Sequence, residues 1–183
     1  LNLHSFDRKF DIIESSGVLH HMDDPMAGWE VLVACLKPGG LMKIGLYSEL
    51  ARQAIVRYRL EIAQSGLSIT KDNIRSLRKK IFNLDDQLSK QIRTWNDYFS
   101  LSDIRDLIFH VQEHRFTLPQ IKFCLEQLGL EFCGFEVVEI VQAFEKFFPE
   151  KNSLYDLEKW SDFENSNPTT FTGMYQFWCQ KVS

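Results

Sequence analysis

The sequence predicts an α/β fold, and two observations carry this prediction. Within the first fifty residues an apolar segment, a segment of helical periodicity and a second apolar segment follow one another. The same alternation of helix and strand returns after residue 118. Strand–helix–strand units build parallel sheets, because a long crossover must separate two parallel strands.

The first three elements form such a βαβ unit. The apolar residues of 10–17 are mostly β-branched and the segment ends at a glycine, which is typical of a strand followed by a turn. Asp24 and Pro25 predict a helix start, with the aspartate as N-cap and the proline in the first turn. We expect the helix to end at the turn 37–40 (Lys-Pro-Gly-Gly), which leads into a second strand over residues 41–48.

Residues 49–117 interrupt this alternation, because they are more polar and have apolar residues at helical spacing. We therefore expect a helical insertion or lid over 49–117, with the α/β core formed by 1–48 and 118–183. The segment 71–93 is basic, and a solvated helix face is the simplest interpretation. The alternative is a surface that steers an anionic substrate or an RNA backbone. Its charged residues are Lys71, Arg75, Arg78, Lys79, Lys80, Lys90 and Arg93 against Asp72, Asp85 and Asp86.

The α/β order resumes at residue 118. A helix over 119–128 ends at Gly129, and strands are expected over 132–139 and 174–181. Between these strands, residues 141–170 predict an irregular connection. Its aromatic residues could form a substrate cage, although such spacing is more typical of a core or an interface. They are Phe144, Phe147, Phe148, Tyr155, Trp160 and Phe163.

Composition excludes several classes of protein. The 183 residues are 44% hydrophobic with a net charge of −4, which excludes a disordered chain and disfavours a protein that coats nucleic acid. No apolar run approaches the roughly 20 residues of a membrane span. The four cysteines show no paired spacing, so we expect reduced core thiols in a cytoplasmic protein. The start at Leu1, without a methionine, suggests a fragment of a longer chain.

Two motifs carry a resemblance to a known family. The block FDIIESSGVLHHMDDP over 10–25, followed by LKPGG over 36–40, resembles the second half of a class I S-adenosylmethionine-dependent methyltransferase. The segments 109–117 and 173–178 further resemble bacterial methyltransferases that carry tetratricopeptide repeats. The resemblance implies the second half of a Rossmann-like sheet, and possible fusion to such repeats in the parent chain.

The resemblance also implies a cofactor, S-adenosylmethionine, and a set of site residues. Ser16, Gly17, Val18 and Leu19 would bind the cofactor, at the carboxyl ends of the strands where open α/β sheets bind ligands. His20 would be catalytic or contact the substrate, whereas a structural alternative is that the His20-His21 pair caps the following helix. Tyr47 and Ser48 would face the substrate, with His110, Glu113 and His114 as further substrate-side candidates. If the acceptor must lose a proton, His20 or His114 would serve as the base.

The chain also departs from the family pattern. The glycine-rich first motif and the acidic residue that holds the ribose do not precede Leu1, so we expect the isolated fragment to be inactive. A non-enzymatic remnant or binding module is the main alternative, and a tRNA-modifying methyltransferase is a further variant. The acceptor, whether a small molecule, a protein or an RNA, is not specified by the sequence. An exposed sheet edge would make self-association plausible.

The segment 110–114 also matches H-x-x-E-H, an inverted zinc-protease motif in which His110 and His114 share a helix face. Five residues make a weak pattern and no third ligand can be identified, so no metal site is expected. A structural role for these histidines and a place in the substrate pocket are the two stronger alternatives.

Overall fold

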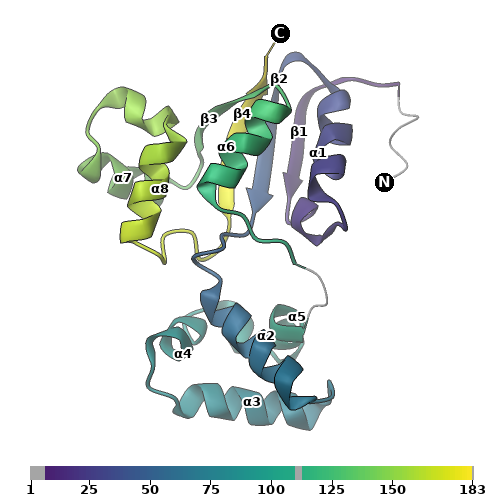
Figure 1. The fold of residues 1–183 in the computed structure, drawn as a ribbon, viewed down its shortest axis with the longest axis vertical. Helices are drawn as coiled ribbons and strands as arrows, with labels where there is room; N and C mark the ends of the chain where they lie inside the picture. Colours follow the sequence, from purple (N-terminus) through teal and green to yellow (C-terminus); the bar gives the residue numbers. More distant parts are fainter. Residues whose placement is uncertain (1–6, 110–112, 183) are drawn as a thin grey trace. The chain divides into compact units, whose positions relative to one another are not determined.

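A computed structural model describes residues 7–109 and 113–182 (Figure 1). The chain divides into two compact units. An α/β unit comprises Leu1–Ala51 and Gln112–Ser183, and a helical unit comprises Arg52–Val111. No helix among the described residues combines the length and the hydropathy that crossing a membrane would require.

A four-stranded mixed sheet forms the centre of the α/β unit, in the order β1-β2-β4-β3. The strands are β1 (Phe10–Ser16), β2 (Leu36–Leu46), β3 (Leu130–Phe135) and β4 (Tyr175–Lys181). β1 and β2 run parallel, whereas β4 runs antiparallel to both β2 and β3. The βαβ unit and the last strand expected from the sequence are therefore present, and the last strand is antiparallel to its two neighbours.

Helices pack on this sheet. They are α1 (Pro25–Ala34), α6 (Leu118–Gln127), α7 (Val138–Phe147) and α8 (Leu157–Ser166), with 3-10 turns η2 (Leu19–His21) and η4 (Lys151–Tyr155). α6 and α8 contact each other, and α7 contacts β3 (Figure 1). Their apolar side chains join those of the strands in one core, which includes the fully buried Trp29, Phe144, Trp160 and Phe177.

Local signals explain where two of these helices begin. The Asp24 carboxylate accepts a hydrogen bond from the Ala27 amide at 3.0 Å, so it caps α1 as expected. Thr117 and Gln120 form a reciprocal capping box at the start of α6. Gly129 follows α6 with a φ of +62°, a conformation that favours glycine.

The helical unit contains α2 (Gln53–Ser65), α3 (Lys71–Asn83), α4 (Gln87–Ile92), the 3-10 turn η3 (Asn96–Tyr98) and α5 (Leu101–Phe109). It has its own core, in which Tyr58, Ile81, Ile92 and Ile104 are buried. The Tyr58 hydroxyl lies 2.6 Å from the Ser89 hydroxyl and ties α2 to α4. Separate cores explain why the two units form compact bodies.

Three boundaries differ from the sequence predictions. β2 begins at Leu36, and the segment 37–40 lies inside it at an irregularity where the register jumps from Phe10↔Leu36 to Ile12↔Leu41. The extra residues on β2 bulge there, and Gly39 has a φ of +70°. β3 occupies Leu130–Phe135 rather than 132–139. The connection 141–170 holds most of α7, together with η4 and α8, and is not irregular.

The cysteines and the aromatic residues lie largely where a core would place them. The four cysteines are free, and Cys35, Cys124 and Cys179 are buried. Phe144 stacks on Trp160 with ring centroids 3.7 Å apart, and both are fully buried. In contrast, Phe147 and Tyr155 are about 60% exposed.

Candidate functional site

The candidate site lies within the α/β unit, where the parallel strands β1 and β2 end. Ser16 pairs with Gly45 in the β1–β2 register, and the Gly17 amide donates to the Gly45 carbonyl at 3.4 Å. The carboxyl ends of both strands therefore meet at one edge of the sheet. This places the predicted cofactor residues at and after the end of β1 on the same edge as Tyr47, which directly follows β2.

Glycines at two positions shape this edge. Gly17 has a φ of +74° and nothing within 4 Å of where a Cβ would lie, so the backbone turns there with open space beside it. A Cβ on Gly45 would lie 2.9 Å from the Ser16 Cα. Gly45 thus allows β1 and β2 to approach closely beneath the site.

The Ser16 hydroxyl is buried and has no hydrogen-bond partner among the described residues. A buried hydroxyl without a partner is costly, so such a group at a strand end is suited to a polar ligand atom. Together with the open space beside Gly17, this hydroxyl fits the polar end of a cofactor. Val18 is 48% exposed, whereas the Leu19 side chain is fully buried in the core.

His20 packs behind Tyr47. The two rings are 3.9 Å apart between centroids and tilted by 33°, and the His21 ring lies 4.4 Å from that of His20. His20 is fully buried, whereas Tyr47 is only partly buried. Of this ring pair, Tyr47 is therefore the residue that keeps some exposed surface.

Backbone hydrogen bonds join the segment 113–116 to the residues around Tyr47, and we call this paired region the stem. The His114 amide donates to the His20 carbonyl at 2.8 Å, and the Phe116 amide donates to the Tyr47 carbonyl at 2.8 Å. The Glu49 amide in turn donates to the Phe116 carbonyl at 2.9 Å. Arg115 adds an ion pair to Glu49, with 2.9 Å between nitrogen and oxygen. Residues distant in sequence are thus brought beside His20 and Tyr47.

The histidine motif is only partly described. His110 lies outside the described residues, and Glu113 and His114 belong to no helix, so the motif is not helical over its last two residues. The Glu113 side chain is 2% exposed, and the His114 Nε2 is buried without a hydrogen-bond partner in the described part of the chain. Within that part, no group of three or more His, Cys, Asp or Glu residues is arranged to hold a metal ion.

Ser48, a predicted substrate residue, is fully buried and belongs to a network that the sequence did not predict. Its hydroxyl donates to Glu164 Oε1 at 2.6 Å and accepts from the Ala51 amide at 3.0 Å. The Tyr175 hydroxyl lies 2.8 Å and 2.6 Å from the two Glu164 carboxylate oxygens. We call Ser48, Glu164 and Tyr175 the buried carboxylate network.

Burial dominates the electrostatics of this network. Glu164 is 2% exposed, and burial raises its pKa although the hydrogen bonds from Ser48 and Tyr175 act in the opposite direction. Burial and the nearby Glu164 also raise the pKa of Tyr175. One sequence signal for Glu164 existed, because it shares the apolar face of α8 with Leu157, Trp160 and Phe163.

Comparisons with known proteins support the fold. The chain is 28% identical over 167 residues to an uncharacterized protein from Synechococcus sp. (strain ATCC 27144 / PCC 6301 / SAUG 1402/1). The match covers 85% of this chain and 40% of that protein. No family model matches the chain. The chain thus spans less than half the length of this curated relative.

Two solved structures resemble the whole chain. Both are of PKMT2 from Rickettsia typhi, and each is 16% identical to this chain, covering 98% of it and 37% of the PKMT2 chain. The TM-score is 0.65 for one structure and 0.60 for the complex with AdoHcy. At this identity the similarity shows the fold alone: the fold of this chain resembles part of the PKMT2 structure.

Proposed function

We propose that this chain supplies part of the cofactor and acceptor site of an S-adenosylmethionine-dependent methyltransferase. The observation that carries the proposal is the position of Ser16–Val18 and Tyr47 at the carboxyl ends of two paired parallel strands. The similarity to PKMT2 in complex with AdoHcy supports it, because AdoHcy is what S-adenosylmethionine becomes after it gives up its methyl group.

The residues present fit one end of such a cofactor. The Ser16 hydroxyl would bind a polar group, and the backbone at Gly17 and Val18 would line the space beside it. When bound, the cofactor would supply an electrophilic methyl group, whose transfer depends mainly on alignment and on exclusion of water. Tyr47 would orient the acceptor, and His20 would hold the Tyr47 ring in place from behind.

The roles of the remaining candidates follow from their burial. His114 would accept a proton from acceptors that must lose one, because its Nε2 has no partner in the described part of the chain. Ser48 would fix the backbone after Tyr47 through Glu164 and would not contact substrate. The helical unit as an insertion or lid, and an association with tetratricopeptide repeats, stay predictions.

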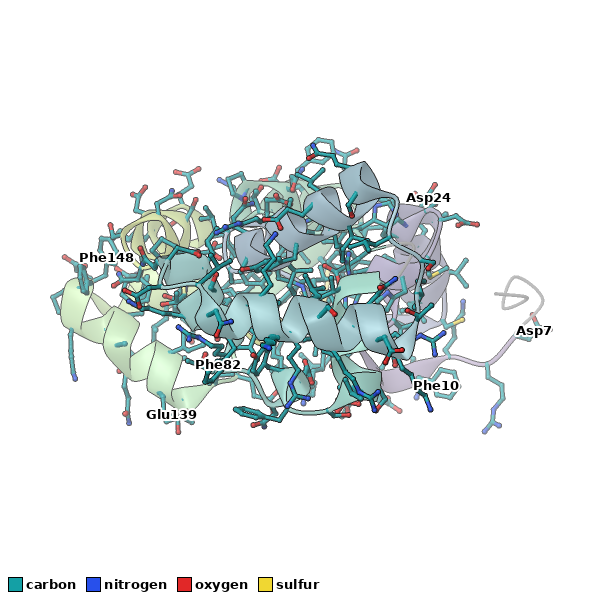
Figure 2. The ribbon with its side chains drawn as sticks, turned by 90° about the horizontal axis from the view of Figure 1, so that it is seen from below. Asp7, Phe10, Asp24, Phe82, Glu139 and Phe148 are labelled. Carbon is teal, nitrogen blue, oxygen red and sulfur yellow. The ribbon has the colours of Figure 1, made fainter. Side chains whose placement is uncertain are left out.

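We propose that residues outside this chain complete the site. β1 is an edge strand in the described sheet, and its Phe10 and Ile12 are 36% and 59% exposed. Figure 2 shows Phe10 on this strand. An apolar strand edge favours pairing with a further strand, and in the isolated chain it favours self-association. The chain spans 37% of the PKMT2 chains, which leaves length there for further strands.

Calorimetry with S-adenosylmethionine tests this proposal. We expect no tight binding to the 183 residues alone, and binding with methyl transfer once the chain is extended by its upstream coding sequence. In that longer protein, Ser16→Ala should weaken cofactor binding, whereas Ser15→Ala is the matched control because adjacent strand residues point to opposite faces. His20→Ala should slow transfer strongly.

Three results decide against parts of the proposal. Tight binding by the 183 residues alone would show that no further part is needed. Equal effects of Ser15→Ala and Ser16→Ala would remove Ser16 from the site, and unchanged turnover would remove His20. A genuine start codon at Leu1, together with no cofactor binding, would favour the alternative of a non-enzymatic remnant or binding module.

A further inference from the structure

A second candidate surface lies wholly within the helical unit. A hollow of about 490 Å³ there is lined mainly by three cationic residues and three aromatic residues. They are Arg75, Arg78, Lys79, Phe82, Tyr98 and Phe99. None of the lining residues is acidic, although the whole chain carries a net charge of −4. We call this surface the basic aromatic face.

Two of its aromatic side chains are exposed without serving the core. Phe82 at the end of α3 is 63% exposed, and Phe99 after η3 is 65% exposed. Phe82 is labelled on α3 in Figure 2. Exposed large apolar side chains that gather on one surface commonly mark a binding site. Because cationic residues line the same hollow, we expect a ligand that carries both negative charge and flat apolar groups.

The rings and the guanidinium groups are held in fixed pairs. The Arg93 guanidinium lies 5.9 Å from the Phe82 ring centroid and donates to the Phe82 carbonyl at 2.8 Å. The Arg78 guanidinium lies 5.6 Å from the Tyr98 ring and donates to the Phe99 carbonyl at 3.3 Å. These hydrogen bonds to backbone carbonyls therefore hold the Arg78 and Arg93 guanidinium groups beside aromatic rings.

Positive charge on this face is only partly neutralised. Arg75 pairs with Asp72 at 3.1 Å, but in the described part of the chain no carboxylate forms an ion pair with Arg78 or Lys79. In contrast, Lys90 elsewhere on the unit pairs with Asp85 at 2.7 Å. Arg78 and Lys79, which line the same hollow as Phe82 and Phe99, thus remain available to an anionic ligand.

We propose that the basic aromatic face binds single-stranded nucleic acid. Phosphates would contact Arg78 and Lys79, and bases would stack on Phe82 and Phe99, because every base presents a flat aromatic surface. An acidic peptide would use the cations but would leave the two exposed rings unexplained. This inference does not depend on methyl transfer, since it concerns another unit and a different activity.

Fluorescence anisotropy with the complete 183-residue chain provides the test. The probes are fluorescein-labelled oligouridylate and oligodeoxyuridylate of about 12 nucleotides, which carry the same base and are near the site size of single-strand binding modules. We expect both probes to bind at 50 mM salt, with an affinity that falls linearly on a plot of log K against log salt. A preference between the two probes would distinguish RNA from DNA as the ligand.

Variants separate the two kinds of contact. Lys79→Ala should reduce the magnitude of the salt slope by about 0.7, the value for one phosphate contact on a single strand. Phe82→Ala and Phe99→Ala should weaken binding about tenfold each and leave the slope unchanged, because stacking releases no counterion. Lys90→Ala is the matched control, since it removes a cation of the same unit that lies outside the hollow.

Several outcomes would overturn the proposal. Failure of both probes to bind at 50 mM salt would refute it directly. Equal losses for Lys79→Ala and Lys90→Ala would mean general charge attraction without a site. Unchanged affinity in both phenylalanine variants, with full competition by polyglutamate, would assign the face to acidic proteins. Circular dichroism of each variant checks that the helices remain folded, as exposed positions lead us to expect.

Discussion

Replacing Tyr175 with phenylalanine removes one hydroxyl from the buried carboxylate network and leaves the ring in place. That hydroxyl contacts both carboxylate oxygens of Glu164, at 2.8 Å and 2.6 Å, so its loss leaves Ser48 as the donor that the structure shows. A hydrogen bond to a charged group contributes about 1.5–3 kcal/mol. We therefore expect the free energy of unfolding of the α/β unit to fall by about 2 kcal/mol at pH 8, which favours the carboxylate form.

Tryptophan fluorescence during urea unfolding measures this change. Of the four tryptophans, Trp29, Trp160 and Trp178 belong to the α/β unit and Trp95 belongs to the helical unit. A Trp95→Phe background restricts the signal to the α/β unit. This substitution breaks no hydrogen bond among the described residues, because the buried Trp95 indole nitrogen has no partner there. The loss of the N–H group should therefore change the free energy of unfolding little.

Tyr155→Phe is the matched control, because Tyr155 is 58% exposed and loses the same atom. Its unfolding free energy should stay within about 0.5 kcal/mol of the parent, as for most surface substitutions. If Tyr175→Phe and Tyr155→Phe were equally stable, the hydroxyl would not be stabilising Glu164, and the reasoning from burial and distance would be refuted.

Two further predictions concern the same unit. The pKa of Glu164 is raised in the folded state, so its contribution to stability is present below the ordinary value of 4.5 and is lost as the pH rises through the raised value. The stability of the parent relative to Glu164→Gln should therefore fall as the pH increases above 4.5. A difference in urea unfolding that does not depend on pH would contradict this. Gly45→Ala would place a Cβ 2.9 Å from the Ser16 Cα and should destabilise the unit by about 1–3 kcal/mol. Gly173→Ala, which has open space, should change the urea midpoint little, and equal midpoints would argue against a close approach of β1 and β2.

Local signals made part of the fold predictable. The N-cap Asp24 and the C-terminal Gly129 act within a few residues, so the start of α1 and the end of α6 could be inferred from the sequence. The helices α7 and α8 were not predicted. Each has only ten residues, and Phe144 of α7 stacks on Trp160 of α8 at 3.7 Å, so tertiary packing stabilises them.

In the candidate site too, features set by strand topology could be predicted, whereas contacts between residues distant in sequence could not. That Ser16 and Tyr47 lie at the same end of the sheet could be expected, because parallel strands end at one edge. The partnership of Ser48 with Glu164 could not, since 116 residues separate them and no local pattern joins them. The full burial of His20 was equally hidden from sequence, because it depends on the Tyr47 ring and on the segment that carries His114.

The stem between Tyr47 and Phe116 has a consequence for how this protein can change over evolutionary time. The chain leaves the α/β unit and returns to it through adjacent residues, since Ser48 and Phe116 form a parallel bridge. The ends of the intervening segment are thus held together by the sheet unit itself, and each doubling of a loop held this way costs only about 0.6 kcal/mol in closure entropy. We therefore expect a change in the length of this segment to leave the register of β2 against β4 unaltered. A sheet unit with such a joint can exchange one helical module for another while the register of its own strands stays unaltered.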